Sequence, residues 1–148
     1  MEVGLISCTK QKQQSPAAPR ELYEPSTYFR KARRYAEAEH DTWYILSAKH
    51  GVLAPDQEPI APYNESLTNA SREKKQAWAA DVYTELEAAD LLTPETTFVV
   101  HAGKDYYEQL VPHLEDAGCT IEILTEGLSF GETLAWYNSH FDATETSE

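Results

Sequence analysis

Short apolar runs and longer amphipathic stretches alternate along the chain. The runs at residues 3–7, 42–47 and 97–101 are continuously apolar, which is typical of strands buried on both faces of a parallel sheet. The run at residues 119–124 alternates apolar and polar positions, which predicts a strand at the edge of the sheet. We therefore expect four strands, each followed by a polar segment and a helix.

The helices are expected where apolar residues recur at helical spacing. They should follow Ser26 and Ser71, two residues suited to helix N-caps, and should also cover residues 104–115 and 132–141. Pro112 predicts a kink or an early end in the third of these helices. Proline-rich segments at residues 9–25 and 51–67 are interpreted as two long loops.

This order of elements predicts an α/β fold, a three-layer sandwich around a mainly parallel sheet of about four strands. Residues 1–141 should form a single domain, and residues 142–148 an acidic tail that we expect to be disordered. In such a fold the segments that follow the strands meet at the carboxyl edge of the sheet, where α/β proteins bind their ligands.

Charge narrows the possible partners. The 148 residues include 25 Asp plus Glu and 12 Lys plus Arg, for a formal net charge of −13. Such a surface argues against non-specific coating of DNA, and it is also typical of proteins from a halophilic, high-salt cytoplasm. Two cysteines without a spacing motif predict no disulfide, and no apolar run suggests a membrane span or a secretory signal, so we expect a cytoplasmic protein without membrane partners.

Basic residues gather where the strands end, against the acidic background. Lys10 and Lys12 follow the first strand, Lys49 the second and Lys104 the third. Together with neighbouring polar groups they predict a pocket for an anion, such as a phosphate, a nucleotide or a nucleic-acid strand. The candidate ligand-binding residues are Ser7, Thr9, Lys10, Lys12, Ser47, Tyr63, His101, Gly103 and Lys104.

Catalytic candidates lie in the same segments. His50 suits general acid–base chemistry, and the glycine after it permits a sharp turn that would orient the ring. Lys49 would contact the anion and lower the pKa of a neighbouring thiol, which makes Cys8 a candidate nucleophile. The alternatives are a structural histidine and a small buried cysteine. Cys8, His50 and His101 could also converge on a metal, but none has a recognised zinc spacing, so we expect no metal and no cofactor.

Two blocks of sequence resemble a known family. They are residues 5–10, Leu-Ile-Ser-Cys-Thr-Lys, and residues 46–51, Leu-Ser-Ala-Lys-His-Gly. Together with Pro55, Pro62 and Tyr63 they are similar to a family of small uncharacterised proteins, a domain of unknown function, over residues 3–137. This resemblance implies which family the chain is related to, but it does not imply a reaction.

A more distant similarity extends to the peroxide-stress YaaA proteins and to the central domain of archaeosine synthase. The shared blocks are residues 7–10, 46–55 and 61–63. The first resemblance implies DNA binding and protection from oxidative damage. The second implies action on a deazaguanine base and a fold of the uracil-DNA-glycosylase type.

The leading hypothesis is thus a nucleotide-, nucleobase- or nucleic-acid-binding protein, and, if it is an enzyme, a glycosylase or transferase acting on a nucleobase. The alternative is a non-catalytic DNA-binding stress protein that uses the basic run Arg30, Lys31, Arg33 and Arg34. A third reading is an interaction domain without a ligand. The sequence indicates no oligomeric state.

Overall fold

The computed structural model describes the backbone of residues 1–145 and the side chains of residues 1–139. It contains one sheet whose strands lie in the order β3-β2-β1-β4-β5. The strands are β1 (Glu2–Ser7), β2 (Thr42–Ser47), β3 (Gly51–Leu53), β4 (Thr97–His101) and β5 (Thr120–Glu122). The pairs β1–β2, β1–β4 and β4–β5 are parallel, whereas β2–β3 is antiparallel. The mainly parallel α/β sheet is confirmed, with five strands instead of four.

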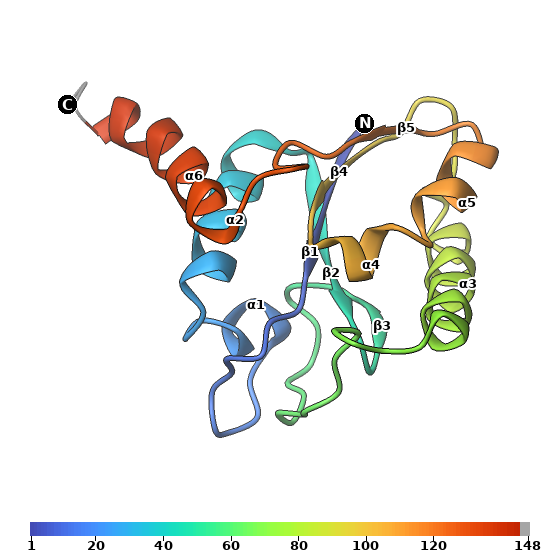
Figure 1. Cartoon of the computed structure of the whole chain (residues 1–148), viewed down its shortest axis with the longest axis horizontal. Coiled ribbons are helices and arrows are strands. Elements are labelled where there is room, and N and C mark those ends of the chain that lie inside the picture. Colours follow the sequence, from blue (N-terminus) through green and yellow to red (C-terminus); the bar gives the residue numbers. More distant parts are fainter. Residues whose placement is uncertain (146–148) are drawn as a thin grey trace.

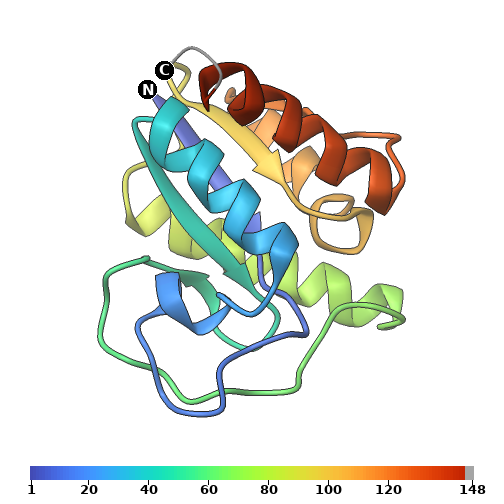
Figure 2. The same cartoon turned by 90° about the vertical axis from the view of Figure 1, so that its left-hand side faces the viewer.

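Helices cover both faces of this sheet, which gives the expected three layers (Figure 1). The helices are α1 (Pro19–Leu22), α2 (Thr27–Glu39), α3 (Arg72–Ala88), α4 (Lys104–Tyr107), α5 (Val111–Asp116) and α6 (Phe130–Glu145). The pair α2 and α6 lies on one face, and α3, α4 and α5 lie on the other. Figure 2 shows α2 and α6 from their outer side, with the two long loops below them at the carboxyl end of the sheet.

Local chemistry explains where α2 and α3 begin. The Ser26 hydroxyl accepts a hydrogen bond from the backbone N–H of Phe29 at 3.2 Å, and the Ser71 hydroxyl accepts one from the N–H of Lys74 at 3.1 Å. Each bond satisfies an N–H that a helix terminus otherwise leaves unpaired. Both predicted N-caps are therefore confirmed.

Four element predictions need correction. The first loop contains α1, because Pro19 occupies the first helical position, where its fixed φ favours a helix and its missing N–H costs nothing. The second loop begins with β3, which forms a hairpin with β2. The helix expected at residues 104–115 is two helices, with Pro112 near the start of α5. Helix α6 begins at Phe130 and continues to Glu145, into the predicted tail, whose residues 146–148 lie outside the described residues.

The hairpin between β2 and β3 explains a sequence block that was interpreted as functional. Residues 48–50 form its turn, and Gly51 follows at a φ of 77°. Short hairpin loops commonly place a residue at their end in this left-handed region of φ, and glycine adopts it without steric penalty. Gly51 takes this place here. The outer side of β3 is covered by α3, since the carboxylate of Glu85 accepts a hydrogen bond from the N–H of Val52 at 3.1 Å. Burial raises the pKa of this carboxyl.

The core lies between the sheet and its two helical layers. The largest side chains with no exposure include Tyr23, Phe29, Phe98 and Tyr137. Both cysteines are buried and free of a disulfide. Within residues 1–145, no helix combines the length and the apolar character that a bilayer crossing requires.

Candidate functional site

The site lies at the point where the strand order reverses. Strands β1 and β4 are neighbours, but the chain leaves β1 for α2 on one face and leaves β4 for α4 and α5 on the other. Their carboxyl ends therefore diverge and leave a crevice, the usual place for a ligand in an open α/β sheet. A cavity of about 1320 Å³ opens here. It is lined by the segments that follow β1, β4 and β5 and by residues 64–69 of the second long loop.

Charge inside the cavity is opposite to that of the protein. The charged residues that line it are Lys10, Lys12, Lys104, Glu65 and Glu126. Three lysines against two glutamates give a formal charge of +1, in a chain whose net charge is −13. Lysines therefore outnumber glutamates on the cavity lining, which is a local inversion of the overall charge.

Lys12 is the most enclosed of these cations. Its Nζ lies 4.6 Å from the ring centroid of Tyr63 and 5.8 Å from that of Tyr23. Burial lowers the pKa of Lys12, and the nearby Cys8 and Glu65 act in the opposite direction. A partly desolvated ammonium on two aromatic rings is strengthened as a partner for an anion, because water screens it less.

Cys8 contributes the thiol on the cavity lining. The residue is only 6% exposed, and its Sγ lies 3.3 Å from the hydroxyl of Tyr106. The backbone N–H of Ala48 donates to the same sulfur at 3.4 Å. Because the Tyr106 hydroxyl already accepts a bond from the N–H of Leu67 at 3.3 Å, its own hydrogen is available for the sulfur. The sulfur is thus held between the Tyr106 hydroxyl and the Ala48 N–H, at a fixed position on the cavity lining.

The side chains of Ser47, Tyr63 and Tyr23 form a hydrogen-bonded cluster next to Lys12. The Ser47 hydroxyl donates to the Tyr63 hydroxyl at 2.7 Å and accepts from the N–H groups of Lys49 and His50 at 3.2 and 3.0 Å. The hydroxyls of Tyr63 and Tyr23 are also hydrogen-bonded. Burial raises the pKa of both tyrosines, so the cluster is neutral. Ser47 and Tyr63 thus hold the hairpin turn and support Lys12, and neither lines the cavity.

Most predicted residues of the first and third segments do line the cavity. They are Cys8, Thr9, Lys10, Lys12, Gly103 and Lys104. Ser7, at the end of β1, is buried and does not reach it.

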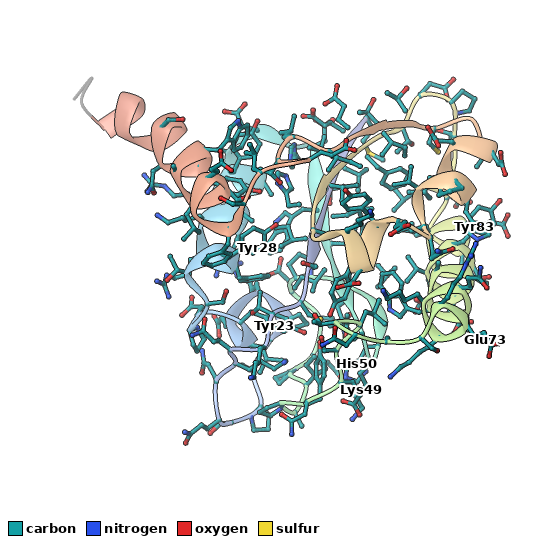
Figure 3. All side chains as sticks on the ribbon, in the orientation of Figure 1. Tyr23, Tyr28, Lys49, His50, Glu73 and Tyr83 are labelled. Atoms are coloured by element: carbon teal, nitrogen blue, oxygen red, sulfur yellow. The ribbon has the colours of Figure 1, made fainter. Side chains whose placement is uncertain are left out.

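Lys49 and His50 lie on the hairpin turn and are not among the residues that line the cavity. Figure 3 shows both on the α3 side of the carboxyl edge, whereas Tyr28 lies on the α2 side. The His50 ring packs edge-on against Tyr63, with centroids 5.3 Å apart. Burial, followed by the charge of Lys49, lowers the pKa of His50. Glu65, which lines the cavity, acts in the opposite direction on the pKa of His50.

His101 was expected in the pocket, but its side chain is enclosed by α2 and α6. Its side chain has no exposure, and its Nδ1 lies 2.6 Å from the Tyr137 hydroxyl of α6. Its Nε2 lies 2.8 Å from Nε2 of His40 at the end of α2. As the last residue of β4 it still follows the alternation of the strand, which turns it toward α2 and α6.

The three residues considered for a metal therefore stay apart. Cys8 lines the cavity, His50 lies on the hairpin turn, and His101 is enclosed by α2 and α6. Within the described part of the chain, no three His, Cys, Asp or Glu side chains form a group that could hold a metal ion.

Sequence reasoning missed the rest of the lining. Tyr28 comes from α2, Glu65 from the second loop, and Leu128 and Phe130 from the segment after β5. The segment after β5 could have been found, because it follows a parallel strand as the other predicted segments do. The second loop was expected at the site through Tyr63, but the residues of this loop that line the cavity follow Tyr63 in the sequence.

The basic run on α2 is largely occupied by the protein's own groups. Arg33 pairs with Glu24 and Glu37, each at 3.3 Å. Arg30 donates to the backbone oxygen of Glu24, and Lys31 donates to the side chain of Asn138 in α6. These partners compete with phosphate groups for the same donors.

Comparison with known proteins gives one match. Residues 3–139 match the sequence model of a family described as a family of unknown function, DUF6884. No curated protein and no solved structure matches the chain.

Proposed function

Since the chain belongs to the DUF6884 family, whose function is unknown, its activity has to be inferred from the cavity, and we propose that this cavity binds a nucleotide or a nucleobase-containing ligand. One observation carries the proposal: the crevice between the ends of β1 and β4 combines a local positive charge with aromatic side chains. Lysines supply contacts for phosphate, and rings such as those of Tyr28 and Tyr107 supply faces for a base.

The cavity also contains groups suited to reading the edge of a base. Asn64 offers both a donor and an acceptor, and Glu65 offers an acceptor close to Lys12. The resemblance of residues 7–10 and 46–55 to YaaA proteins and to archaeosine synthase supports the same ligand class, as does the uracil-DNA-glycosylase-like fold which we propose from it.

The catalytic form of the proposal is cleavage or transfer at an N-glycosidic bond. Cys8 is the nucleophile in this proposal, because it is the one predicted catalytic residue on the cavity lining. Attack of its sulfur on the anomeric carbon would form a carbon–sulfur bond, while the base leaves with the electrons of the broken carbon–nitrogen bond and takes up the proton of the thiol. A second acceptor, water or another base, would then release the sugar from the sulfur. His50 has no part in this step.

The experiment is a panel of nucleotides, nucleobases, deazaguanines and short oligonucleotides, screened by thermal stability and followed by calorimetric titration. A ligand at a hundred times its dissociation constant stabilises the native state by about 2.7 kcal/mol. Lys104→Ala should weaken binding about tenfold or more, because a hydrogen bond to a charged group contributes roughly 1.5–3 kcal/mol. Lys49→Ala is the matched control, an exposed lysine outside the cavity. Equal affinity of the two variants, or no ligand for the wild type, would contradict the proposal.

The alternative, a non-catalytic DNA-binding protein, predicts a different outcome. Only oligonucleotides would then bind, with an affinity that falls steeply with salt. The pairing of Arg33 with two glutamates makes us favour the cavity.

A further inference from the structure

Two exposed apolar side chains lie at one end of the cavity. Among the described residues, the large apolar side chains that face solvent are Met1, Leu128 and Phe130. Leu128 and Phe130 both belong to the segment after β5, and both line the cavity. Phe130 is 68% exposed, so most of its ring has no partner within the chain. An exposed phenyl ring in a cavity is typical of a surface that a ligand covers.

The backbone that carries Phe130 is fixed. Ser129 and Glu132 form a reciprocal capping box at the start of α6: the N–H of Ser129 donates to Oε1 of Glu132 at 3.0 Å, and the N–H of Glu132 donates to Oγ of Ser129 at 3.2 Å. Hydrogen bonding from the backbone N–H of Ser129, followed by that from its side chain, lowers the pKa of the Glu132 carboxyl. Phe130 is thus presented from a defined helix start, which reduces the entropy that a stacked ligand would have to remove.

The two ends of the cavity have different chemistry. Lys10 and Lys12 follow β1, Lys104 follows β4, and Leu128 and Phe130 follow β5. Strands β1, β4 and β5 are consecutive in the sheet. Because neighbouring strands are about 4.8 Å apart, the ends of β1 and β5 are separated by about 10 Å. A ligand that uses both ends must therefore have both an anionic group and a flat apolar group.

We propose that Leu128 and Phe130 form the ring-binding end of the cavity and that the ligand is a nucleoside phosphate, with its phosphate at the ends of β1 and β4 and its base on Phe130. This inference rests on the proposed function and narrows it. A free nucleobase would leave the lysines without a partner, and a free phosphate would leave the ring of Phe130 uncovered.

Binding measurements with the parts of the ligand test this assignment. Nucleoside 5′-monophosphates, the matching nucleosides and pyrophosphate are titrated calorimetrically into the wild type, Phe130→Ala and Phe130→Trp. Loss of a stacked ring reduces affinity by roughly fivefold to a hundredfold. We expect Phe130→Ala to lose that factor for the monophosphates and nothing for pyrophosphate, and Phe130→Trp to retain the wild-type affinity. Tyr83→Ala, an aromatic truncation on α3 outside the cavity, is the control.

Three results would overturn the inference, and they differ from a failure of the proposed function. Monophosphates that bind Phe130→Ala as tightly as the wild type would show that the ring is not used. Wild-type protein that binds pyrophosphate as tightly as monophosphates would show the same. A change of oligomeric state in Phe130→Ala, seen by light scattering without a loss of nucleotide affinity, would assign the ring to a contact between copies of the chain. Absence of any binding to the wild type would instead remove the proposed function itself.

Discussion

The buried imidazole pair makes the stability of this protein depend on pH. His101 is fully enclosed, and its two ring nitrogens contact the Tyr137 hydroxyl and Nε2 of His40. Burial, followed by the neighbouring His40, lowers the pKa of His101 to about 3 from the ordinary 6.5. The ring is therefore neutral in the folded protein, whereas the unfolded chain takes up a proton on the same ring as the pH falls below 6.5.

The sign and size of the effect follow from this difference. The unfolded state binds more protons than the native state between pH 6.5 and 3, so the free energy of unfolding decreases as the pH falls through that window. One pKa unit corresponds to about 1.4 kcal/mol. At about pH 5, some 1.5 units below the ordinary value, the loss attributable to His101 is about 2 kcal/mol relative to neutral pH.

Urea unfolding at about pH 7 and pH 5 measures this loss. The wild type and His101→Gln are compared, because the variant lacks the titrating ring while other groups remain. We expect the wild type to lose about 2 kcal/mol more than the variant between the two values. Assigned NMR signals of the imidazole should show a neutral His101 throughout that range. Equal losses in both proteins, or a ring that titrates near its ordinary pKa, would refute the reasoning.

Three further substitutions test the packing. Gly51→Ala should lower the free energy of unfolding by at least about 1–2 kcal/mol. Gly51 has a φ of 77°, and a Cβ there would overlap the Glu85 carboxylate. An unchanged urea midpoint would contradict this. Gly4→Ala should destabilise the fold and displace His40, since the added Cβ would lie 2.6 Å from its Cδ2; undisturbed His40 NMR shifts would argue against it. Ser26→Ala should cost about 1 kcal/mol in chemical denaturation through loss of the α2 cap, and a difference below a few tenths would count against the cap.

The sequence predicted the elements whose signal is local. Continuous apolar runs identified β1, β2 and β4, and Ser26 and Ser71 marked two helix starts. Strand β3 was missed because it has three residues and depends on the hairpin turn, whose Gly51 was interpreted as orienting a catalytic ring. In the structure this sequence block forms the hairpin turn.

Residues predicted for the site line the cavity where they follow β1 or β4, but not where they belong to the strand itself. Cys8, Lys10 and Lys104 lie beyond the strand ends and reach the cavity, but His101 is still inside β4, where alternation directs it into a helical layer. The second loop was expected at the site through Tyr63, but residues 65–69 were not, because their approach to the cavity depends on tertiary contacts that no local pattern encodes.

The hydrogen bond from Val52 to Glu85 has a consequence for solubility. Strand β3 is the last strand on its side of the sheet, and an outermost strand exposes N–H groups that can pair with a strand of another molecule. The Glu85 carboxylate occupies one of those N–H groups and adds negative charge to this border of the sheet. With only three residues in β3, little free backbone remains on which an intermolecular sheet could begin. We therefore expect this acidic side chain on α3 to disfavour edge-to-edge association through β3.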